Sequence, residues 1–312
     1  MINPNKIKKT RKHVVINETL FAEELKKAQI VVELRNFRPS TTASYIKSLS
    51  EFLQWLFDTK QLRIADASED DLRDFLFYLK KERNPVLSPS TINIYNASIR
   101  KYFRYVLKKM LDRDSLPYME TDHPLPVVPG KKEVKKLIFS TQDLRLRLAF
   151  SLAYGCALRI GETVSLKCSD ISLSRMKLTV RAQNSKSRYA GEVDLPENIV
   201  SLLKQYIYQL YRNAKPDDWL FPGREPGSHL TDEALRNAFK GRLNDLGWHD
   251  IGYTFHSFFR HAHGLHYYQG GADLFQVKER LRHRSINSTL IYVRLDGVHR
   301  RRSDGGNPFD EL

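Results

Sequence analysis

Apolar side chains recur at helical spacing in the first third of the chain. After Ser40 and Thr41, either of which could cap a helix, apolar residues follow at intervals of three and four positions. The expected inward residues are Tyr45, Leu49, Phe52, Leu53 and Leu56. The pattern predicts an amphipathic helix with one face in a core.

Two more helices are predicted before residue 110. Ser68 precedes a run whose apolar face would hold Leu72, Phe75, Leu76 and Leu79. Ser88 and Pro89 open the next helix, because the first-turn N–H that proline lacks has no partner in any helix. Its inward residues would be Ile92, Tyr95, Ile99, Phe103 and Val106. An all-helical domain is therefore expected over residues 18–115.

A cluster of prolines separates this region from the rest of the chain. The segment 116–131 contains Pro117, Pro124, Pro126 and Pro129. Prolines between two patterned regions indicate an extended linker and a domain boundary. The expected organisation is a basic arm at 1–17, the helical domain at 18–115, the linker at 116–131, a second domain at 132–295 and a tail at 296–312.

The second region mixes helical and alternating patterns. Residues 133–157 read as one apolar helix, and residues 177–181 and 189–195 read as paired strands joined by a polar turn at 183–187. Further helical segments are expected at 232–246, 256–269, 273–282 and 288–293. A small antiparallel sheet among many helices is an α+β arrangement.

Composition narrows the class of protein. The 312 residues include 51 Lys and Arg against 36 Asp and Glu, a formal net charge of +15, which favours a polyanionic partner. A hydrophobic content of 41% excludes a mostly disordered chain. Cys156 and Cys168 cannot build a disulfide framework, and the apolar stretch 148–158 is too short to span a bilayer. We expect a cytoplasmic protein without a membrane partner.

Basic side chains gather in two places. The arm carries Lys8 and Lys9 and has no acidic residue among its first thirteen positions. Four more lie outside the apolar face of the third helix: Arg100, Lys101, Arg104 and Lys108. Such residues can simply be solvated, but in a chain this basic they are candidates for contact with DNA phosphates.

Polar residues punctuate apolar surroundings at four places in the second region. These are Arg159 with Glu162, Lys186 in the polar turn, the segment 256–261 (HSFFRH), and His283 with Tyr292. Each alone has an ordinary explanation, such as an ion pair on a helix, a solvated loop lysine or a helix cap. Four histidines fall between residues 256 and 266, but no cysteine or carboxylate completes a metal-ligand spacing, so no metal site is expected.

Together and in this order, the residues resemble the tyrosine recombinase (phage integrase) family. The likeness is strongest in three blocks: 152–170 (LAYGCALRIGETVSLKCSD), 260–274 (RHAHGLHYYQGGADL) and 281–292 (LRHRSINSTLIY). The turn NSKSR fits the family's basic hairpin. The resemblance implies an all-α, SAM-like core-binding domain followed by a mostly helical α+β catalytic domain with a small antiparallel sheet.

The resemblance also assigns roles by position. The implied catalytic residues are Arg159, Lys186, Arg260, His283 and Tyr292, with Glu162 in support. The family's histidine three residues before the second arginine is replaced by Ser257, and His256 lies one residue earlier. Both positions fall on nearly the same helix face, and we favour His256, with Ser257 as the alternative phosphate contact. Ala157 and Arg282 replace two glycines of the family pattern.

The chemistry of these residue types suits phosphodiester cleavage. A tyrosine hydroxyl, with a pKa near ~10, must lose its proton as it attacks, and guanidiniums donate in pairs to phosphate oxygens. The resemblance implies a 3′-phosphotyrosyl link at Tyr292 and protonation of the leaving 5′-oxygen by Lys186. No metal, ATP or other cofactor is required, because cationic side chains stabilise the transition state.

The resemblance further implies partners and rival functions. The partners would be a double-stranded DNA recombination site and three more copies of the chain, in a homo-tetramer with C-terminal tail exchange on nucleoid DNA. Integration or excision of a mobile element would be the outcome. The rivals are an Xer-like dimer-resolving recombinase, a DNA-binding relative without catalysis, and a type IB topoisomerase-like relaxer.

Overall fold

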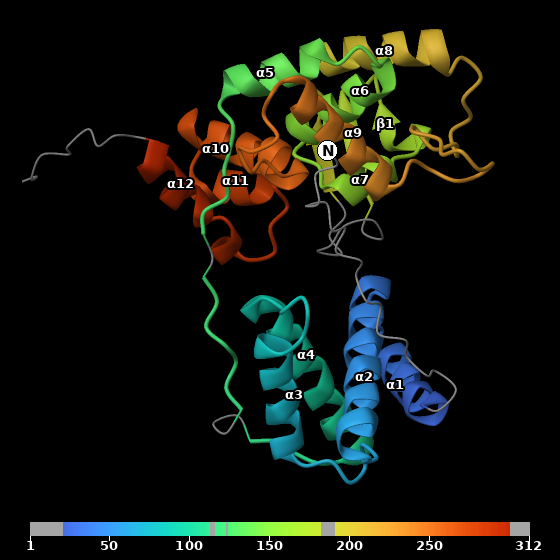
Figure 1. Ribbon diagram of the computed structural model, residues 1–312. Coiled ribbons are helices and arrows are strands. Elements are labelled where there is room, and N and C mark those ends of the chain that lie inside the picture. Colours follow the sequence, from blue (N-terminus) through green and yellow to red (C-terminus); the bar gives the residue numbers. More distant parts are fainter. Residues whose placement is uncertain (1–20, 113–115, 123, 182–190, 300–312) are drawn as a thin grey trace, which may run out of the picture. The chain divides into compact units, whose positions relative to one another are not determined.

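The chain folds into two compact units, residues 1–123 and 124–312 (Figure 1). The computed structural model describes residues 21–112, 116–122, 124–181 and 191–299. The arm lysines Lys8 and Lys9, the turn with Lys186, and residues 300–312 of the expected tail lie outside these ranges.

The first unit is built from helices. They are α1 (Ala22–Leu34), α2 (Pro39–Lys60), α3 (Glu69–Lys81), α4 (Pro89–Tyr102) and the short π-helix η1 (Phe103–Leu107), which continues α4. Helix α2 packs against α1, α3 and α4, and Figure 1 shows α1 beside α2. The helical domain expected from periodicity is thus confirmed in its described part.

Local sequence explains where these helices begin. Ser68 accepts the N–H of Asp71 and donates its own N–H to the Asp71 carboxylate, so the two residues form a capping box. Ser88 caps α4, with Pro89 in the first turn, as expected. The cap expected at residue 40 or 41 is wrong: α2 begins at Pro39, and Arg38 occupies the N-cap without a side-chain bond.

The core of the first unit follows the predicted apolar faces. Val106 is only partly buried, whereas every other predicted inward residue of the three helices is at most 6% exposed. Helix α1, which the apolar pattern did not single out, adds Ala28 and Val32 to the same core. Spacing therefore located the part of this core that α2, α3 and α4 contribute.

The second unit surrounds a small sheet with helices. The strands β1 (Ile171–Ser172), β2 (Lys177–Val180) and β3 (Gly191–Asp194) are antiparallel in the order β1-β2-β3, with Leu178 opposite both Ile171 and Val193. The helices are α5 (Lys131–Ser140), α6 (Leu144–Gly155), α7 (Ile160–Val164), α8 (Glu197–Leu210), α9 (Asp232–Asp245), the π-helix η3 (His256–His261), α10 (Ala262–Gln269), α11 (Leu274–Arg280) and α12 (Ile291–His299). Short 3₁₀ turns lie at η2 (Cys168–Asp170) and η4 (Ile286–Ser288).

Several expectations for this unit need correction. The single helix expected at 133–157 is two helices, because Thr141 takes an extended conformation and Asp143 caps α6 by accepting the N–H of Leu146. Strand β1 and helix α8 were not predicted. The expected tail boundary at 296 falls inside α12, where Asp296 is buried and bonded to Gln269.

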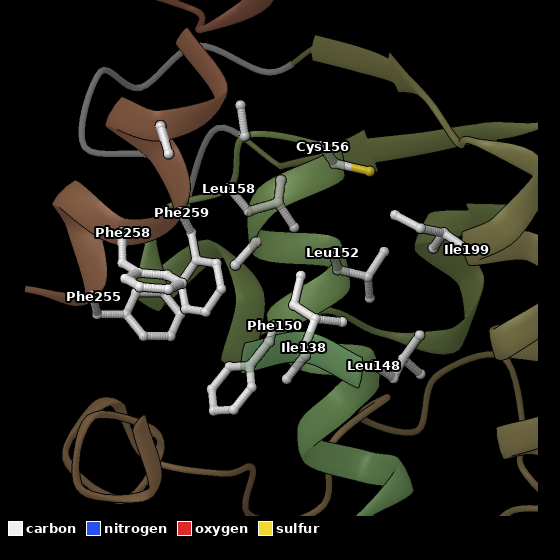
Figure 2. Close-up of a cluster of buried hydrophobic side chains, with 14 of the residues drawn as sticks. Ile138, Leu148, Phe150, Leu152, Cys156, Leu158, Ile199, Phe255, Phe258 and Phe259 are labelled. Atoms are coloured by element: carbon white, nitrogen blue, oxygen red, sulfur yellow. The ribbon is translucent and has the colours of Figure 1, made fainter. Parts of the chain in front are cut away.

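The core of the second unit is organised around α6. Leu148, Phe150 and Leu152 are fully buried, and Figure 2 shows them among Ile199 of α8 and the aromatic side chains at the start of η3. The ring of Phe150 stacks on Phe259, with 5.3 Å between centroids. This packing places α6 against η3. The candidate site residue Arg159 follows α6 in the chain, and Arg260 lies in η3.

Candidate active site

The chain leaves α6 through a Schellman turn that presents Arg159. The N–H of Leu158 donates to the carbonyl of Ala153 and that of Ala157 to Tyr154, which satisfies the last carbonyls of the helix. Ala157 has a φ of 51°, in the left-handed region where glycine is the usual residue. The turn places Arg159 at the N-cap of α7.

Glu162 lies buried at the centre of three arginines. Its Oε1 is 2.6 Å from Nη1 of Arg159, and its Oε2 is 2.9 Å from Nη2 of Arg282 and 3.9 Å from Nη1 of Arg260. Burial by itself raises the pKa of Glu162, but the three guanidiniums outweigh it and hold the pKa below its ordinary value. An ionised carboxylate thus orients the arginines.

Arg260 is held from behind by the backbone. Its guanidinium is 1% exposed and donates to the carbonyls of Ala157 and Leu281. Burial and Arg159 lower the pKa of Arg260, while Glu162 opposes the shift. A guanidinium has five N–H donors, so these two bonds leave donors for a ligand. The side chain of Arg159 is 20% exposed.

Arg282 fills the position that is glycine in the family pattern. Its φ is 52°, and its side chain points inward to Glu162 and to the carbonyls of Cys156 and Ala157. Its Nε is buried without a partner among the described residues. Three guanidiniums against one carboxylate leave a formal surplus of two positive charges, which suits the site to an anion.

The π-helix η3 separates the two candidates for the missing histidine. Ser257 is 2% exposed and exchanges hydrogen bonds with Thr254, whose N–H donates to Oγ of Ser257 while Oγ1 of Thr254 accepts the N–H of Ser257, both at 3.0 Å. His256 is exposed, and its ring meets His261 edge to face at 4.6 Å. Hydrogen bonds in a π-helix span five residues, which brings positions 256 and 261 together.

Tyr292 is fully buried at the start of α12. Its hydroxyl lies 3.1 Å from Nδ1 of His261, and its ring is nearly parallel to that of His283, 6.4 Å away. A Cβ atom on Gly264 would lie 2.5 Å from Cζ of Tyr292, so the ring packs directly on the backbone of α10. Burial raises the pKa of Tyr292, and Arg260 and Arg159 partly oppose the shift.

His283 completes the wall beside the tyrosine. Its Nδ1 lies 3.0 Å from Oγ1 of Thr289. Burial and the charges of Arg260 and Arg159 lower the pKa of His283 to about 3, so the ring is neutral at pH 7. A neutral imidazole bonded through one nitrogen keeps the other for a ligand.

The structure brings most of the predicted residues into one site. Contacts and electrostatic influence connect Arg159, Glu162, Arg260, His256, His283 and Tyr292. The hydroxyl of Ser257 is instead hydrogen-bonded to the backbone of Thr254, just before η3. Sequence reasoning gave no catalytic role to His261, although its place directly after Arg260 was a usable signal, and it noted Arg282 only as a departure from the pattern.

The basic residues predicted for DNA contact are not equivalent. Arg100 donates to the carbonyls of Leu111, Asp112 and Leu116 at 2.7–3.0 Å, so its guanidinium is already bonded to the backbone of its own domain. Three others are less engaged: Lys101 lies over the ring of Phe37, Arg104 is exposed near Tyr105, and Lys108 is exposed. A hollow of about 670 Å³ lies among Arg100, Lys101 and Arg104.

The histidine cluster divides between two environments. His266 bonds to the hydroxyl of Tyr154 and His263 accepts from Arg280, whereas His261 contacts the hydroxyl of Tyr292. Within the described ranges, no group of three or more His, Cys, Asp or Glu side chains is placed to hold a metal ion. Nor does any helix in these ranges have the length and apolarity to cross a membrane.

Comparison with known proteins identifies the family. The phage integrase family model matches residues 130–299, and the model of the phage integrase N-terminal SAM-like domain matches residues 25–113. Integrase/recombinase y4qK of Sinorhizobium fredii is 30% identical over 265 residues, which cover 85% of this chain and 82% of the relative. Tyrosine recombinase XerD of Oceanobacillus iheyensis is 28% identical over 272 residues, 83% of this chain and 89% of the relative. The chain belongs to the phage integrase family of tyrosine recombinases, enzymes that cleave and rejoin DNA strands.

Solved structures agree on the fold. XerH site-specific recombinase bound to its difH substrate matches with a TM-score of 0.63 and 22% identity, over 89% of this chain and 84% of that one. The Tn1549 transposon integrase in complex with transposon right end DNA matches with a TM-score of 0.64 and 17% identity, over 86% and 94%. The predicted fold class, a SAM-like helical domain followed by a mostly helical catalytic domain with a small sheet, is confirmed.

Proposed function

We propose that this protein is a site-specific recombinase that cleaves and rejoins duplex DNA through a 3′-phosphotyrosyl link to Tyr292. The observation that carries the proposal is the position of the Tyr292 ring, which lies nearly parallel to that of His283 and close enough to Arg260 and Arg159 for their charges to oppose the effect of burial on its pKa. A tyrosine beside a surplus of fixed positive charge is the arrangement that attack on a phosphodiester requires.

The division of work in the site follows from its geometry. Glu162 holds Arg159 and Arg260, whose remaining donors would bind the non-bridging oxygens of the scissile phosphate as they gain charge. His283 and His256 would add neutral hydrogen-bond donors. The bond from Tyr292 to phosphorus forms while the bond to the 5′-oxygen breaks; the Tyr292 hydroxyl loses its proton to a base, and the 5′-oxygen takes a proton. We assign this proton to Lys186 from the family pattern.

The wider assignment uses the domain plan and the relatives. Residues 18–115 would clamp duplex DNA and residues 132–295 would carry the chemistry, in a cytoplasmic homo-tetramer on two DNA sites with C-terminal tail exchange. Similarity to an integrase/recombinase and to a transposon integrase favours integration or excision of a mobile element. Similarity to XerD makes dimer resolution by an Xer-like recombinase the alternative.

A trapped covalent adduct tests the proposal. Duplexes with a random core and a nick release a short 5′-hydroxyl fragment after cleavage, so the attack cannot be reversed and the adduct accumulates. Full-length protein is incubated with this pool, denatured, and the linked DNA is sequenced, which also defines the site. We expect an adduct whose DNA-bearing peptide contains Tyr292 and which Tyr292→Phe abolishes.

The matched control is Tyr267→Phe, on α10, where the side chain is exposed and stacks near His263 rather than in the site. This variant should form the adduct at the rate of the unchanged protein. Sequence-specific binding without any adduct would contradict the proposal and favour a DNA-binding relative. Relaxation of supercoiled DNA irrespective of sequence would favour the topoisomerase-like alternative.

A further inference from the structure

The hydroxyl of Tyr292 has a specific partner that the family pattern did not assign. Nδ1 of His261 lies 3.1 Å from the hydroxyl oxygen, and the two ring centroids are 5.9 Å apart. The two residues are 31 positions apart in the chain, so tertiary packing makes the contact. Because the hydroxyl is the atom that would attack phosphorus, its partner is placed to receive the departing proton.

Packing holds both members of this pair. On one side the Tyr292 ring lies against Gly264, where a Cβ atom would overlap it. On the other side His256 meets His261 edge to face at 4.6 Å, a contact that the π-helix makes possible. The oxygen and the nitrogen are therefore kept at hydrogen-bond distance by their neighbours.

The surroundings of His261 keep it neutral in the DNA-free protein. The side chain is partly buried, and the groups facing it are Arg260, His256, His283 and Tyr292. Burial, with the charge of Arg260, lowers the pKa of His261 to about 4. At pH 7 one ring nitrogen is thus an acceptor, and the position of Nδ1 allows the Tyr292 hydroxyl to donate to it.

We propose that His261 is a catalytic residue whose Nδ1 takes the proton of the Tyr292 hydroxyl as Tyr292 attacks the scissile phosphorus. This inference rests on the proposed function. In the step, the Tyr292 oxygen–phosphorus bond forms, the bond from phosphorus to the 5′-oxygen breaks, the tyrosine proton moves to His261, and the 5′-oxygen takes a proton from a separate acid. Rejoining reverses each transfer, and His261 returns the proton to Tyr292.

In the DNA-free protein the proton remains on Tyr292, and its transfer to His261 becomes favourable only when a phosphodiester is bound. Burial raises the pKa of Tyr292 and lowers that of His261, so the proton stays on the tyrosine in the DNA-free protein. A bound phosphodiester adds negative charge beside His261, which favours its protonated form. The transfer is therefore coupled to the presence of substrate, which protects the nucleophile from premature ionisation.

Two variants separate proton transfer from simple positioning. His261→Ala removes the partner, whereas His261→Asn places an amide near the position of Nδ1 that can hydrogen-bond but cannot take a proton. Single-turnover adduct formation is measured with full-length protein on the nicked duplex selected above, at saturating protein and from pH 6 to pH 9. The matched control is His263→Asn, a partly buried histidine two positions along that bonds to Arg280.

We expect both His261 variants to form the adduct about 100-fold more slowly at pH 7, the usual contribution of a general base. Their rates should rise about tenfold per pH unit as hydroxide replaces the base, while the unchanged protein and His263→Asn follow a flatter profile. A duplex with sulfur in place of the leaving 5′-oxygen needs no general acid, because a thiolate leaves without a proton. It should therefore rescue a Lys186 variant, which lacks the acid. It should not rescue the His261 variants, which lack the base.

Other outcomes overturn the inference. If His261→Asn keeps the rate and pH profile of the unchanged protein, His261 only positions the ring. If His261→Ala is faster than the unchanged protein, His261 restrains Tyr292 in a resting position. In both cases the unchanged protein still forms the adduct, so the proposed function stands and only the role of His261 fails. Failure of the unchanged protein to form an adduct would instead refute both.

Discussion

The guanidinium of Arg282 lies 2.9 Å from the carboxylate of Glu162, at a position where the family pattern has glycine. Both replaced glycines, at Ala157 and Arg282, have a φ near +50°, which costs an L-residue about 1–2 kcal/mol. The two turns are tied together, because the carbonyl of Ala157 accepts from both Arg260 and Arg282. Arg282 thus has a strained backbone conformation, and its guanidinium is the third positive charge beside the Glu162 carboxylate.

Glu162→Gln should destabilise the protein severely. The substitution leaves three largely buried guanidiniums without their counter-charge, and breaking such a network costs about 3–5 kcal/mol. Denaturant unfolding at pH 7 measures the loss. Glu197→Gln, on the exposed first turn of α8, is the control and should change the unfolding free energy by less than about 0.5 kcal/mol.

The same variant has a defined pH dependence. The pKa of Glu162 is lower in the folded protein than its ordinary value of 4.5, so its ionised form stabilises the fold above that value. This stabilisation is lost as the pH falls through the lower folded value. The difference between the unchanged protein and Glu162→Gln should therefore narrow below about pH 4.5. A difference that stays constant to pH 3 would count against the ionised network.

The features that the sequence predicted correctly are mostly those determined by residues close together in the chain. The apolar faces of α3 and α4 were predicted residue by residue, because a helix in a small bundle buries one stripe at its own period. The break between α5 and α6 was missed, although the polar stretch 140–143 (STQD) separates two apolar runs and ends in an aspartate, a usual N-cap residue.

Several residues of the candidate site were predicted from the sequence, but their contacts and the presence of His261 and Arg282 were not. Arg159, Arg260 and Tyr292 followed from the order of motifs along the chain. The bond between His261 and Tyr292 could not, because the two residues are 31 positions apart and meet only through tertiary packing, of which apolar spacing carries no sign. Chain position alone likewise could not show that Arg282 turns inward onto Glu162.

Gly264→Ala should impair cleavage by displacing the nucleophile. The new methyl group would lie 2.5 Å from Cζ of Tyr292, so the ring must move, and a displacement of about 1 Å can cost about 100-fold in rate. The measurement is the single-turnover rate of adduct formation. Gly241→Ala in α9 is the control: a Cβ there meets nothing within 4 Å, so it should stabilise the helix by about 0.5–1 kcal/mol and leave the rate unchanged. Equal rates for both variants would show that Tyr292 tolerates the clash.

Arg104 and Arg100 should respond differently to neutralisation. Arg104 is exposed, so if it contacts a phosphate, Arg104→Gln should weaken DNA binding and reduce the slope of log affinity against log salt by about 1. Arg100 holds three backbone carbonyls, so Arg100→Gln should destabilise the protein by at least about 1.5 kcal/mol. Binding titrations at several salt concentrations, together with urea unfolding, test the pair. A reduced salt slope for Arg100→Gln in a stably folded protein would return that residue to the DNA contacts.

The start of η3 offers a test of which side chain replaces the family's histidine. The Ser257 hydroxyl accepts the N–H of Thr254 and donates to its carbonyl at 3.2 Å, while the whole residue is 2% exposed. His256 is exposed and borders His261, which contacts the Tyr292 hydroxyl. The Ser257 hydroxyl is therefore already hydrogen-bonded to Thr254, whereas His256 is available to a phosphate.

Two alanine variants should accordingly separate stability from catalysis. Ser257→Ala removes the acceptor of a backbone N–H at the helix start, which costs about 1 kcal/mol of unfolding free energy, but it should cleave DNA at the rate of the unchanged protein. His256→Ala should unfold normally, because its side chain is exposed, yet form the adduct about 100-fold more slowly through the loss of a transition-state contact. Urea unfolding and single-turnover rates measured on the same preparations give both quantities. If Ser257→Ala is the slow variant while His256→Ala cleaves normally, the serine contacts the phosphate and the assignment of His256 is wrong.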